Sequence, residues 1–578
     1  ANTTGTNNTA MGRISLDANT TGSQNIAIGN EALTSNTTAD NNVAVGYNAL
    51  GAVTTQGNLT AVGRSALEAN TTGDSNTGLG YGALASNTTG SANTAVGLSA
   101  LDASTTGGSN TAVGAGALGA NTTASGNVAV GKNALVANTT GAANVAVGKE
   151  ALFTNTTTAN NTAVGNQALY NNAGASNTAV GSGALAANTT GATNVAVGDA
   201  SLGANTTGTG NTAVGHDSSL SMTTGGENTS LGINSLRVAT TGSFNTAIGG
   251  GALQNTTTAS NNTSVGYNSL LANTTGADNT AVGRSALSAN TTASENTAVG
   301  RLAMAANTTG TANIAMGHES LDANTTGSSN TALGAYAMSA NTTANANVAV
   351  GYQALTATTT GEYNVALGGD ALAANTTASN NVAIGKNAMV AATTGGNNIA
   401  IGRDAGDSTI TTGGGNIIVG YGTELGGAGQ ENQIVIATNS AGKGSSTAFI
   451  NANGGAIYNG GNTTAWDQTS DRRIKKNIVD NNVGLDAINK VRVRNFEYRT
   501  KEEVTELPEN CAVEQTGLQL GVIAQEVQEH FPEMVTEESG GDLSVQSDDF
   551  TWYLINAVQE LSAQVEELKS KSHEKCDK

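Results

Sequence analysis

Residues 127–143 read Asn-Val-Ala-Val-Gly-Lys-Asn-Ala-Leu-Val-Ala-Asn-Thr-Thr-Gly-Ala-Ala, and variants of this unit recur about every 17 residues. Each unit begins with Asn-[Thr/Val/Ile]-Ala-[Val/Ile/Met/Leu]-Gly. The motif's glycine falls at Gly12, Gly29, Gly46, Gly63, Gly80, Gly97, Gly114, Gly131 and onward to Gly402 and Gly420. The spacing slips rarely, with one residue missing before Gly181 and one extra before Gly420. A register kept this closely indicates a repeat architecture.

Each unit predicts a short strand, a turn, a second short segment and another turn. In Val128-Ala129-Val130 the two-residue period of a strand sends both valines to one face and the alanine to the other. Ala134 and Leu135 form a second apolar patch, and Asn-Thr-Thr-Gly at 138–141 is typical of turns. One unit is too small to bury its valines alone, so we expect neighbouring units to stack as coils of a parallel β-solenoid in which every strand pairs above and below. About 25 coils at about 4.8 Å each would form a rod of the order of 120 Å.

A helical solenoid is the alternative architecture. It is poorly supported, because the unit is too short for a pair of helices. Asn, Gly and β-branched residues, which disfavour helices, also recur in every unit.

This stretch, roughly residues 1–436, resembles the head repeats of trimeric autotransporter adhesins, where motifs like Asn-Ser-Val-Ala-Ile-Gly build a parallel β-roll in a three-chain head. The repeat period here is longer than the usual one in that class. The resemblance implies an adhesin-like rod on a cell or particle surface, and a homotrimer.

Composition excludes an ordinary enzyme core. The chain has 578 residues, of which 76 are glycine, and only 3% are aromatic and 11% charged. The formal net charge of −20 argues against nucleic acid or an anionic membrane as partner. No apolar run approaches the roughly 20 residues of a membrane span, so we expect no membrane insertion. The four histidines do not cluster with acids, and we assign no metal and no cofactor.

The residue directly after the repeat glycine varies while its neighbours stay fixed, and we call these positions the post-glycine column. Freedom beside a fixed motif indicates an outward-facing position, and Tyr47, Arg64 and Tyr81 on successive coils form a candidate surface ladder with cation–π contacts. A functional interpretation is a contact strip for a host or cell-surface glycan or receptor. The alternative, which we favour, is a solvated face that tolerates any side chain. The column includes Tyr47, Arg64, Tyr81, Lys132, Lys149, Asp199, His216, Tyr267, Arg284, Arg301, His318, Tyr352, Lys386 and Arg403.

The recurring Asn-Thr-Thr triplets match the acceptor pattern for N-glycosylation. They occupy the turn of every coil, and turn formation explains them without any modification.

The character of the chain changes after the repeats. Residues 437–469 form a Gly- and Asn-rich transition segment, and 470–578 have the composition of a small α+β domain. Within it we expect a helix near 484–488, strands at 491–498 and 518–523, and a helix at 525–530. A final amphipathic helix at 553–572 carries a heptad seam, which favours a three-stranded coiled coil over a lone helix packed on its own domain. The seam residues are Leu554, Val558, Leu561, Val565 and Leu568.

Three motifs in this region closely resemble the intramolecular chaperone domain at the C-terminus of phage tailspikes, endosialidases and L-shaped tail fibres. They are Ser-Asp-Arg-Arg-Ile-Lys-Lys-Asn-Ile at 470–478, Gly-Leu-Asp at 484–486, and Gly-Val-Ile-Ala-Gln-Glu-Val at 521–527, followed by Phe-Pro-Glu. The resemblance covers about 470–570. It implies a trimeric chaperone that holds three chains in register and then cuts itself off before the motif's serine.

Carried over by motif position, that activity uses a serine–lysine dyad of Ser470 and Lys475 and cuts the Thr469–Ser470 bond. A serine hydroxyl is a weak nucleophile until a base takes its proton, and a lysine acts as a base only when its pKa is lowered. Lys476 is the second candidate for the base. The alternative is that the basic residues near Lys475 only pair with acids of this acidic domain. A longer segment at 545–553 replaces the family's usual Val-Asp-Tyr before the last helix.

The sequence therefore predicts a mainly β protein, a trimeric parallel β-solenoid followed by a small α+β chaperone domain and a coiled-coil helix. The expected function is an extracellular adhesion fibre like a phage tail fibre, located on a virion or a cell surface. Its only enzymatic activity would be single-turnover self-cleavage. A bacterial cell-surface adhesin is the first alternative. A polysaccharide-degrading tailspike ranks lower, because it needs paired carboxylates that the acid-poor repeats hardly supply.

Overall fold

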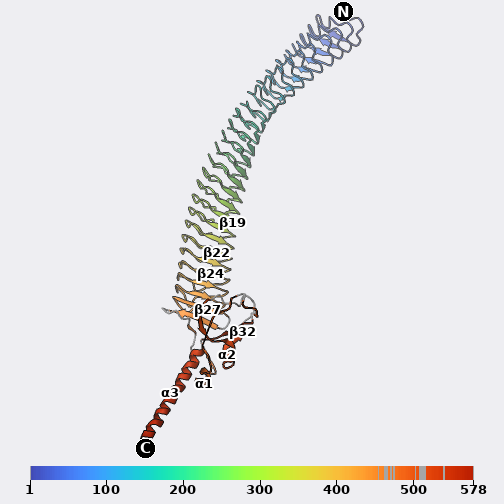
Figure 1. The fold of residues 1–578 in the computed structure, drawn as a ribbon. Helices are drawn as coiled ribbons and strands as arrows, with labels where there is room; N and C mark the ends of the chain where they lie inside the picture. Colours follow the sequence, from blue (N-terminus) through green and yellow to red (C-terminus); the bar gives the residue numbers. More distant parts are fainter. Residues whose placement is uncertain are drawn as a thin grey trace. The chain divides into compact units, whose positions relative to one another are not determined.

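The computed structural model describes residues 2–452, 455–460, 467–468, 472, 475–500, 503–506, 516–537, 541–547 and 549–576. The chain divides into two compact units, Ala1–Thr469 and Ser470–Lys578. The first unit, which we call the shaft, is a stack of similar coils that curves gently along its length (Figure 1).

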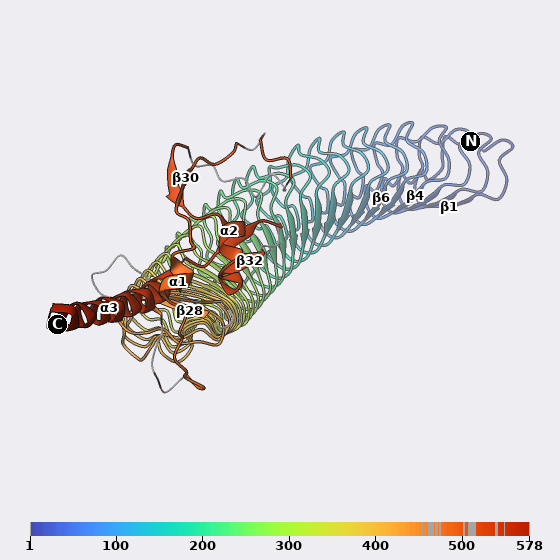
Figure 2. The same cartoon turned by 60° about the horizontal axis from the view of Figure 1, so that its bottom comes forward.

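Each coil of the shaft contributes one three-residue strand that pairs in parallel with the strands of the coils before and after it. In Figure 2 the coils follow one another in the same orientation, with β1, β4 and β6 along one side. The predicted parallel β-solenoid of roughly 17-residue coils is confirmed. The strands are β1 (Thr9–Met11), β2 (Ile26–Ile28), β3 (Val43–Val45), β4 (Thr60–Val62), β5 (Thr77–Leu79), β6 (Thr94–Val96), β7 (Thr111–Val113), β8 (Val128–Val130), β9 (Val145–Val147), β10 (Thr162–Val164), β11 (Thr178–Val180), β12 (Val195–Val197), β13 (Thr212–Val214), β14 (Thr229–Leu231), β15 (Thr246–Ile248), β16 (Thr263–Val265), β17 (Thr280–Val282), β18 (Thr297–Val299), β19 (Ile314–Met316), β20 (Thr331–Leu333), β21 (Val348–Val350), β22 (Val365–Leu367), β23 (Val382–Ile384), β24 (Ile399–Ile401), β25 (Ile417–Val419) and β26 (Ile434–Ile436).

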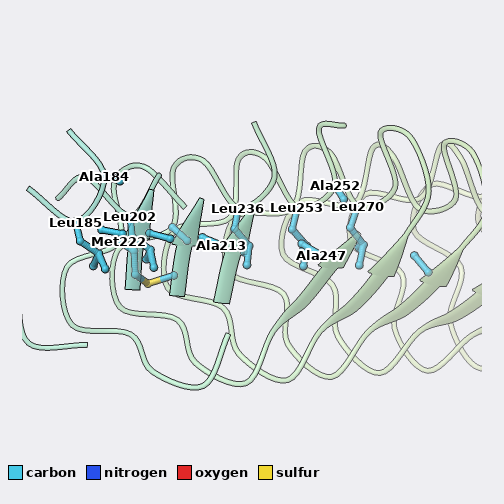
Figure 3. Close-up of a cluster of buried hydrophobic side chains, with 14 of the residues drawn as sticks. Ala184, Leu185, Leu202, Ala213, Met222, Leu236, Ala247, Ala252, Leu253 and Leu270 are labelled. Atoms are coloured by element: carbon cyan, nitrogen blue, oxygen red, sulfur yellow. The ribbon is translucent and has the colours of Figure 1, made fainter. Parts of the chain in front are cut away.

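The interior of the shaft is lined by alanine and leucine, not by valine. In β8 the middle residue, Ala129, is fully buried, whereas Val128 and Val130 on the other face are only half-buried. Leu135 and Ala134 complete the interior of the same coil, and both are fully buried. Figure 3 shows part of the resulting core, from Ala184 and Leu185 to Leu270. The predicted alternation is confirmed. Stacking leaves the valines half-buried on the outer face, while the inward middle position holds alanine in most coils and Ile418 and Val435 in β25 and β26.

Two rows of buried asparagines join the coils. The amide oxygen of Asn127 accepts the backbone N–H of Asn144 at 2.8 Å, and the Asn144 side chain donates to the carbonyl of Thr158 at 2.9 Å. These asparagines have no exposed surface, so their hydrogen bonds satisfy polar groups that water cannot reach.

The second row runs through the Asn-Thr-Thr turns. The side chain of Asn138 donates to the amide oxygen of Asn121 at 3.3 Å and to the carbonyl of Gly141 at 2.9 Å. Asn138 is fully buried, as are most asparagines of this row. Their burial leaves no room for an attached sugar and agrees with the interpretation of the triplets as turns.

The repeat glycine can be no other residue. Gly131 has φ of 133°, a conformation that L-residues rarely adopt, and a Cβ there would lie 2.5 Å from the carbonyl oxygen of Gly148. The same close approach recurs from coil to coil. Asn133, Leu135 and Ala143 also have positive φ, at 56°, 54° and 55°. The coil therefore depends on stacking to hold a backbone that an isolated segment would not keep.

The shaft ends in a different strand pattern. β26 pairs in parallel with β27 (Thr447–Ala452), which pairs antiparallel with β28 (Gly455–Gly460), and β28 pairs antiparallel with β29 (Asp467–Gln468). The segment predicted as a transition thus contributes strands to the shaft's own sheet.

The second unit is a small α+β arrangement, as predicted. Its two hairpins pair β30 with β31 and β32 with β33, both antiparallel. Val527, Phe531, Met534 and Tyr553 form its buried core. The elements are α1 (Leu485–Ile488), β30 (Arg494–Phe496), β31 (Gln519–Gly521), α2 (Ala524–Gln528), the 3₁₀ helix η3 (Pro532–Met534), β32 (Val535–Glu537), β33 (Leu543–Val545) and α3 (Asp549–Cys576).

Two adjacent glycines test the close approach between coils. Gly368 has φ of 139° and a Cβ there would lie 2.5 Å from the carbonyl oxygen of Gly385. At Gly369 the nearest atom would be 3.9 Å away and φ is not strained. We expect Gly368→Ala to lower the free energy of local opening of this coil by about 2–4 kcal/mol, measured by amide hydrogen exchange. Gly369→Ala is the control and should change it little. Equal protection in the two variants would contradict the steric argument.

Candidate functional site

The post-glycine column faces outward and brings its predicted residues together. The guanidinium of Arg64 lies 5.6 Å from the ring centroid of Tyr47 and 5.7 Å from that of Tyr81. The two rings remain 46% and 52% exposed. The three residues come from successive coils, and the parallel register of β3, β4 and β5 holds them at one position of the coil. The arrangement is a cation between two accessible aromatic faces.

A second ladder lies further along the shaft, formed by residues of this column together with one neighbour of it. Arg301 hydrogen-bonds His318 at 2.6 Å, and His318 packs edge-on against Tyr336 with centroids 5.3 Å apart. Tyr336 in turn packs edge-on against Tyr352 at 6.1 Å. The sequence pattern did not single out Tyr336, because it lies one residue beyond the post-glycine position. The sequence feature that could have identified Tyr336 is its position directly beside a column already rich in aromatic residues.

A pair of carboxylates near the end of the shaft was also missed. Asp407 hydrogen-bonds Glu424, whose two oxygens also accept the backbone N–H groups and hydroxyls of Ser408 and Thr409. The hydrogen bond to Glu424, with burial second, raises the pKa of Asp407 to about 6. Burial acts to raise the pKa of Glu424, but its hydrogen bonds outweigh burial and lower it. The longer coil before Gly420 was the only signal in the sequence.

This pair does not have the geometry of a glycosidase. The two carboxyl groups of such an enzyme stand about 5 Å or more apart, on either side of the scissile bond. Asp407 and Glu424 bond each other directly, and Glu424 is occupied by the loop at 408–409. Their arrangement is that of a clasp closing the last regular coils.

In the second unit, the predicted cleavage residues Thr469 and Ser470 lie outside the described residues. Lys475 and Lys476 are described, and both are exposed in the single chain. The backbone N–H of Lys475 donates to the carbonyl of Arg472 at 3.2 Å. The dyad of Ser470 and Lys475 therefore stays a prediction.

The first half of the terminal helix α3 packs against the rest of the second unit, although a longer segment precedes the helix. The Tyr553 ring lies 4.9 Å from that of Phe531, and its hydroxyl donates to Glu533 at 3.0 Å. Glu560 of α3 accepts the backbone N–H of Leu485 at 2.9 Å. The helix starts at Asp549, four residues earlier than expected, because the added residues extend it.

The predicted heptad seam of α3 is exposed. Leu554, Val558, Leu561, Val565 and Leu568 are 49, 64, 48, 40 and 66% exposed. An amphipathic helix with an open seam of this spacing offers a surface for other helices.

Arg494 and Glu526 form a two-point ion pair in this unit, at 2.7 and 3.2 Å. Beside it, Lys490, Arg492, Glu529 and His530 help to line a polar cavity of about 390 Å³. In the described part of the chain, no three His, Cys, Asp or Glu side chains come together as a metal site. Within those same ranges, no helix has the length and apolar character to cross a bilayer.

One comparison with known proteins gives a match. Residues 470–536 match the family described as "Chaperone of endosialidase". The match starts at the first residue of the second unit and covers the predicted serine and lysine. It confirms the predicted chaperone-type domain in this region. No curated protein and no solved structure matches the chain.

The carboxylate clasp predicts a stability that depends on pH. The raised pKa of Asp407 adds stability that is present at low pH and is lost as pH rises through about 6. The lowered pKa of Glu424 adds stability that is present above its ordinary value of 4.5 and is lost in more acidic solution. We expect the amides of the coils around 404–425 to have higher protection factors at pH 5.5 than at pH 7.5, where each exchange rate is divided by the intrinsic base-catalysed rate at the same pH.

Asp407→Asn keeps a hydrogen-bond donor toward Glu424 but cannot ionise. The coils of this variant should therefore not lose stability between pH 5.5 and pH 7.5. Glu431→Gln, at an exposed carboxylate of the following coil that does not contribute to the pKa shifts of the pair, is the control and should keep that loss of stability. If wild type and Asp407→Asn respond to pH alike, the clasp does not stabilise these coils.

Proposed function

We propose that the chain is one protomer of a homotrimeric extracellular adhesion fibre of the phage tail-fibre kind. The shaft forms the length of the fibre. The chaperone-type domain brings three chains into register, folds them together and then separates from the shaft by cutting before Ser470.

The observation that carries this proposal is the outward face of the strands. The third strand position is Val, Ile, Leu or Met from β1 to β26, and the first is Thr, Val or Ile. In the single chain these side chains are partly or largely exposed, for example Leu79 at 44% and Met316 at 46%. Other outward columns, such as the post-glycine one, hold charged, aromatic and small side chains. An outward position that is never polar over the whole shaft indicates a face that is covered.

Another copy of the chain is the partner that suits this face. The face repeats with the same coil spacing along the whole shaft, and a second shaft carries a surface of the same length and period. Packing copies side by side would bury both rows of Val, Ile and Leu, which each coil cannot cover by itself.

The number three rests on the second unit. The α3 seam has the four-three spacing of a coiled coil and is open in the single chain. The resemblance of residues 470–570 to intramolecular chaperones implies a trimer. Since Lys475 is exposed in one chain, assembly is the step that would enclose it beside Ser470.

The assembly prediction uses the strand face. Val130→Glu with Val147→Glu places two carboxylates on the outward face of adjacent coils, where burial between copies would cost several kcal/mol. We expect the purified variant to shift from trimer to monomer or aggregate, measured by light scattering after size-exclusion chromatography. Ala143→Glu with Asn160→Glu is the control, on the same coils at exposed positions where other coils carry Glu227 and Glu295. A variant at Val130 and Val147 that remains a trimer would show that copies do not meet on this face.

The processing prediction uses the serine. Ser470→Ala removes the nucleophile, and we expect the chain to keep its full mass of 57.0 kDa on a denaturing gel and by intact mass spectrometry. Ser547→Ala, an exposed serine in the same unit, should be cut like wild type. Cleavage of Ser470→Ala at the Thr469–Ser470 bond would rule out the assigned nucleophile.

A further inference from the structure

The positive charges of the shaft are concentrated on one line. Residues 1–469 contain ten Lys and Arg residues, and eight of them directly follow a repeat glycine. The two others are Arg237 and Lys443. Because the glycines stack from coil to coil, these eight side chains lie on one column along the shaft. They are Arg13, Arg64, Lys132, Lys149, Arg284, Arg301, Lys386 and Arg403.

The negative charges avoid this line. Asp199 is the single acid at a post-glycine position, although the shaft is acidic as a whole. Its other acids occupy different outward columns, such as those of Glu68 and Glu227. A face that was merely solvated would take both signs alike. The separation of sign indicates that the column is suited to an anionic partner.

Some cations of the column are already paired with carboxylates. Lys149 lies 3.5 Å from Glu150, and Arg403 lies 3.2 Å from Asp404. Arg64 and Arg284 form no ion pair with any described residue, and both are exposed. These two guanidinium groups keep their donors available for a ligand.

Aromatic rings accompany the unpaired arginines. Arg64 lies between the exposed rings of Tyr47 and Tyr81, and Tyr267, one coil before Arg284, is 60% exposed. A sugar ring packs its apolar face on an aromatic side chain, and a carboxylate accepts two parallel hydrogen bonds from a guanidinium. The column thus offers both groups that an acidic sugar needs, on neighbouring coils.

We propose that the post-glycine column binds an acidic polysaccharide laid along the shaft, with its carboxylates on Arg64 and Arg284 and its rings against the tyrosines beside them. The coils repeat at about 4.8 Å, which is close to the length of one sugar ring in an extended chain. Successive sugars therefore meet successive coils. This inference rests on the proposed adhesion function and specifies the class of its ligand.

The chemistry favours a polysaccharide over a nucleic acid. Duplex nucleic acid carries one charge for about every 1.7 Å, too densely for a column whose eight cations are spread over about 25 coils, and the neighbouring columns carry acids. A polysaccharide with at most one carboxylate on each ring carries its charge less densely and also presents sugar rings to the tyrosines of the column.

The test uses the full-length protein and polygalacturonate, a uronic-acid polymer, with its methyl-esterified form as an uncharged counterpart. Binding is measured by isothermal titration calorimetry at low salt. We expect polygalacturonate to bind and the ester to bind at least tenfold more weakly. Arg64→Gln with Arg284→Gln should weaken binding of polygalacturonate roughly tenfold, since two charged contacts are lost. Arg237→Gln with Lys443→Gln removes the same charge away from the column and is the matched control.

Three results would overturn the proposal: equal binding of the ester, equal weakening by the control pair, or tighter binding of duplex DNA than of polygalacturonate. Light scattering on the same samples reports the assembly separately. A trimer that does not bind polygalacturonate contradicts the ligand but not the fibre, whereas a monomeric wild-type protein contradicts the fibre itself.

Discussion

The structure depends on the hydrogen bonds between one coil and the next, and above all on the buried asparagine that begins each coil. Its amide oxygen accepts the backbone N–H of the asparagine that begins the following coil, as Asn127 does from Asn144. Its amide nitrogen donates to a carbonyl 14 residues further along the chain, as Asn144 does to Thr158. A coil with a buried asparagine and several positive-φ residues would be unstable alone, because it would leave polar groups unpaired and backbone strained. Stacking pairs the polar groups, and the hydrogen bonds between coils offset the cost of the strained backbone, so the unit is stable only in an array.

The same stacking decides where apolar side chains can lie. The glycine column brings the coils into close backbone contact and the interior narrows to alanine, leucine and asparagine. Apart from Ile418 and Val435 in β25 and β26, the larger β-branched residues of the strands are left on the outside. A globular protein places such residues in its core, whereas here they form a continuous outer face. The proposed packing of copies against one another follows from the position of these apolar residues on the outer face.

Positions that neither stack nor line the interior are free to vary, and the candidate functional features occupy them. The post-glycine column carries the Tyr47–Arg64–Tyr81 ladder on a backbone that every coil holds in the same way. Near the end of the array the 17-residue pattern is interrupted. There Glu424, which is paired with Asp407, accepts hydrogen bonds from the loop at 408–409. Because the interior side chains are nearly the same in every coil, the function of such a shaft depends on the outward side chains of its coils.

The sequence by itself determined the period, the parallel stacking, the outward post-glycine column and the chaperone-type region, because each leaves a pattern along the chain. Asn, Gly and alternating Val and Ala recur at fixed spacing, and short motifs mark the domain after 470. Only the tertiary structure decided which strand face is inside, since alternation separates Ala129 from Val128 and Val130 without saying which of them the coil can enclose. It also decided the clasp of Asp407 and Glu424 and the contact of Tyr336 with His318, because these pairs meet across coils whose local sequence gives no sign of the partner.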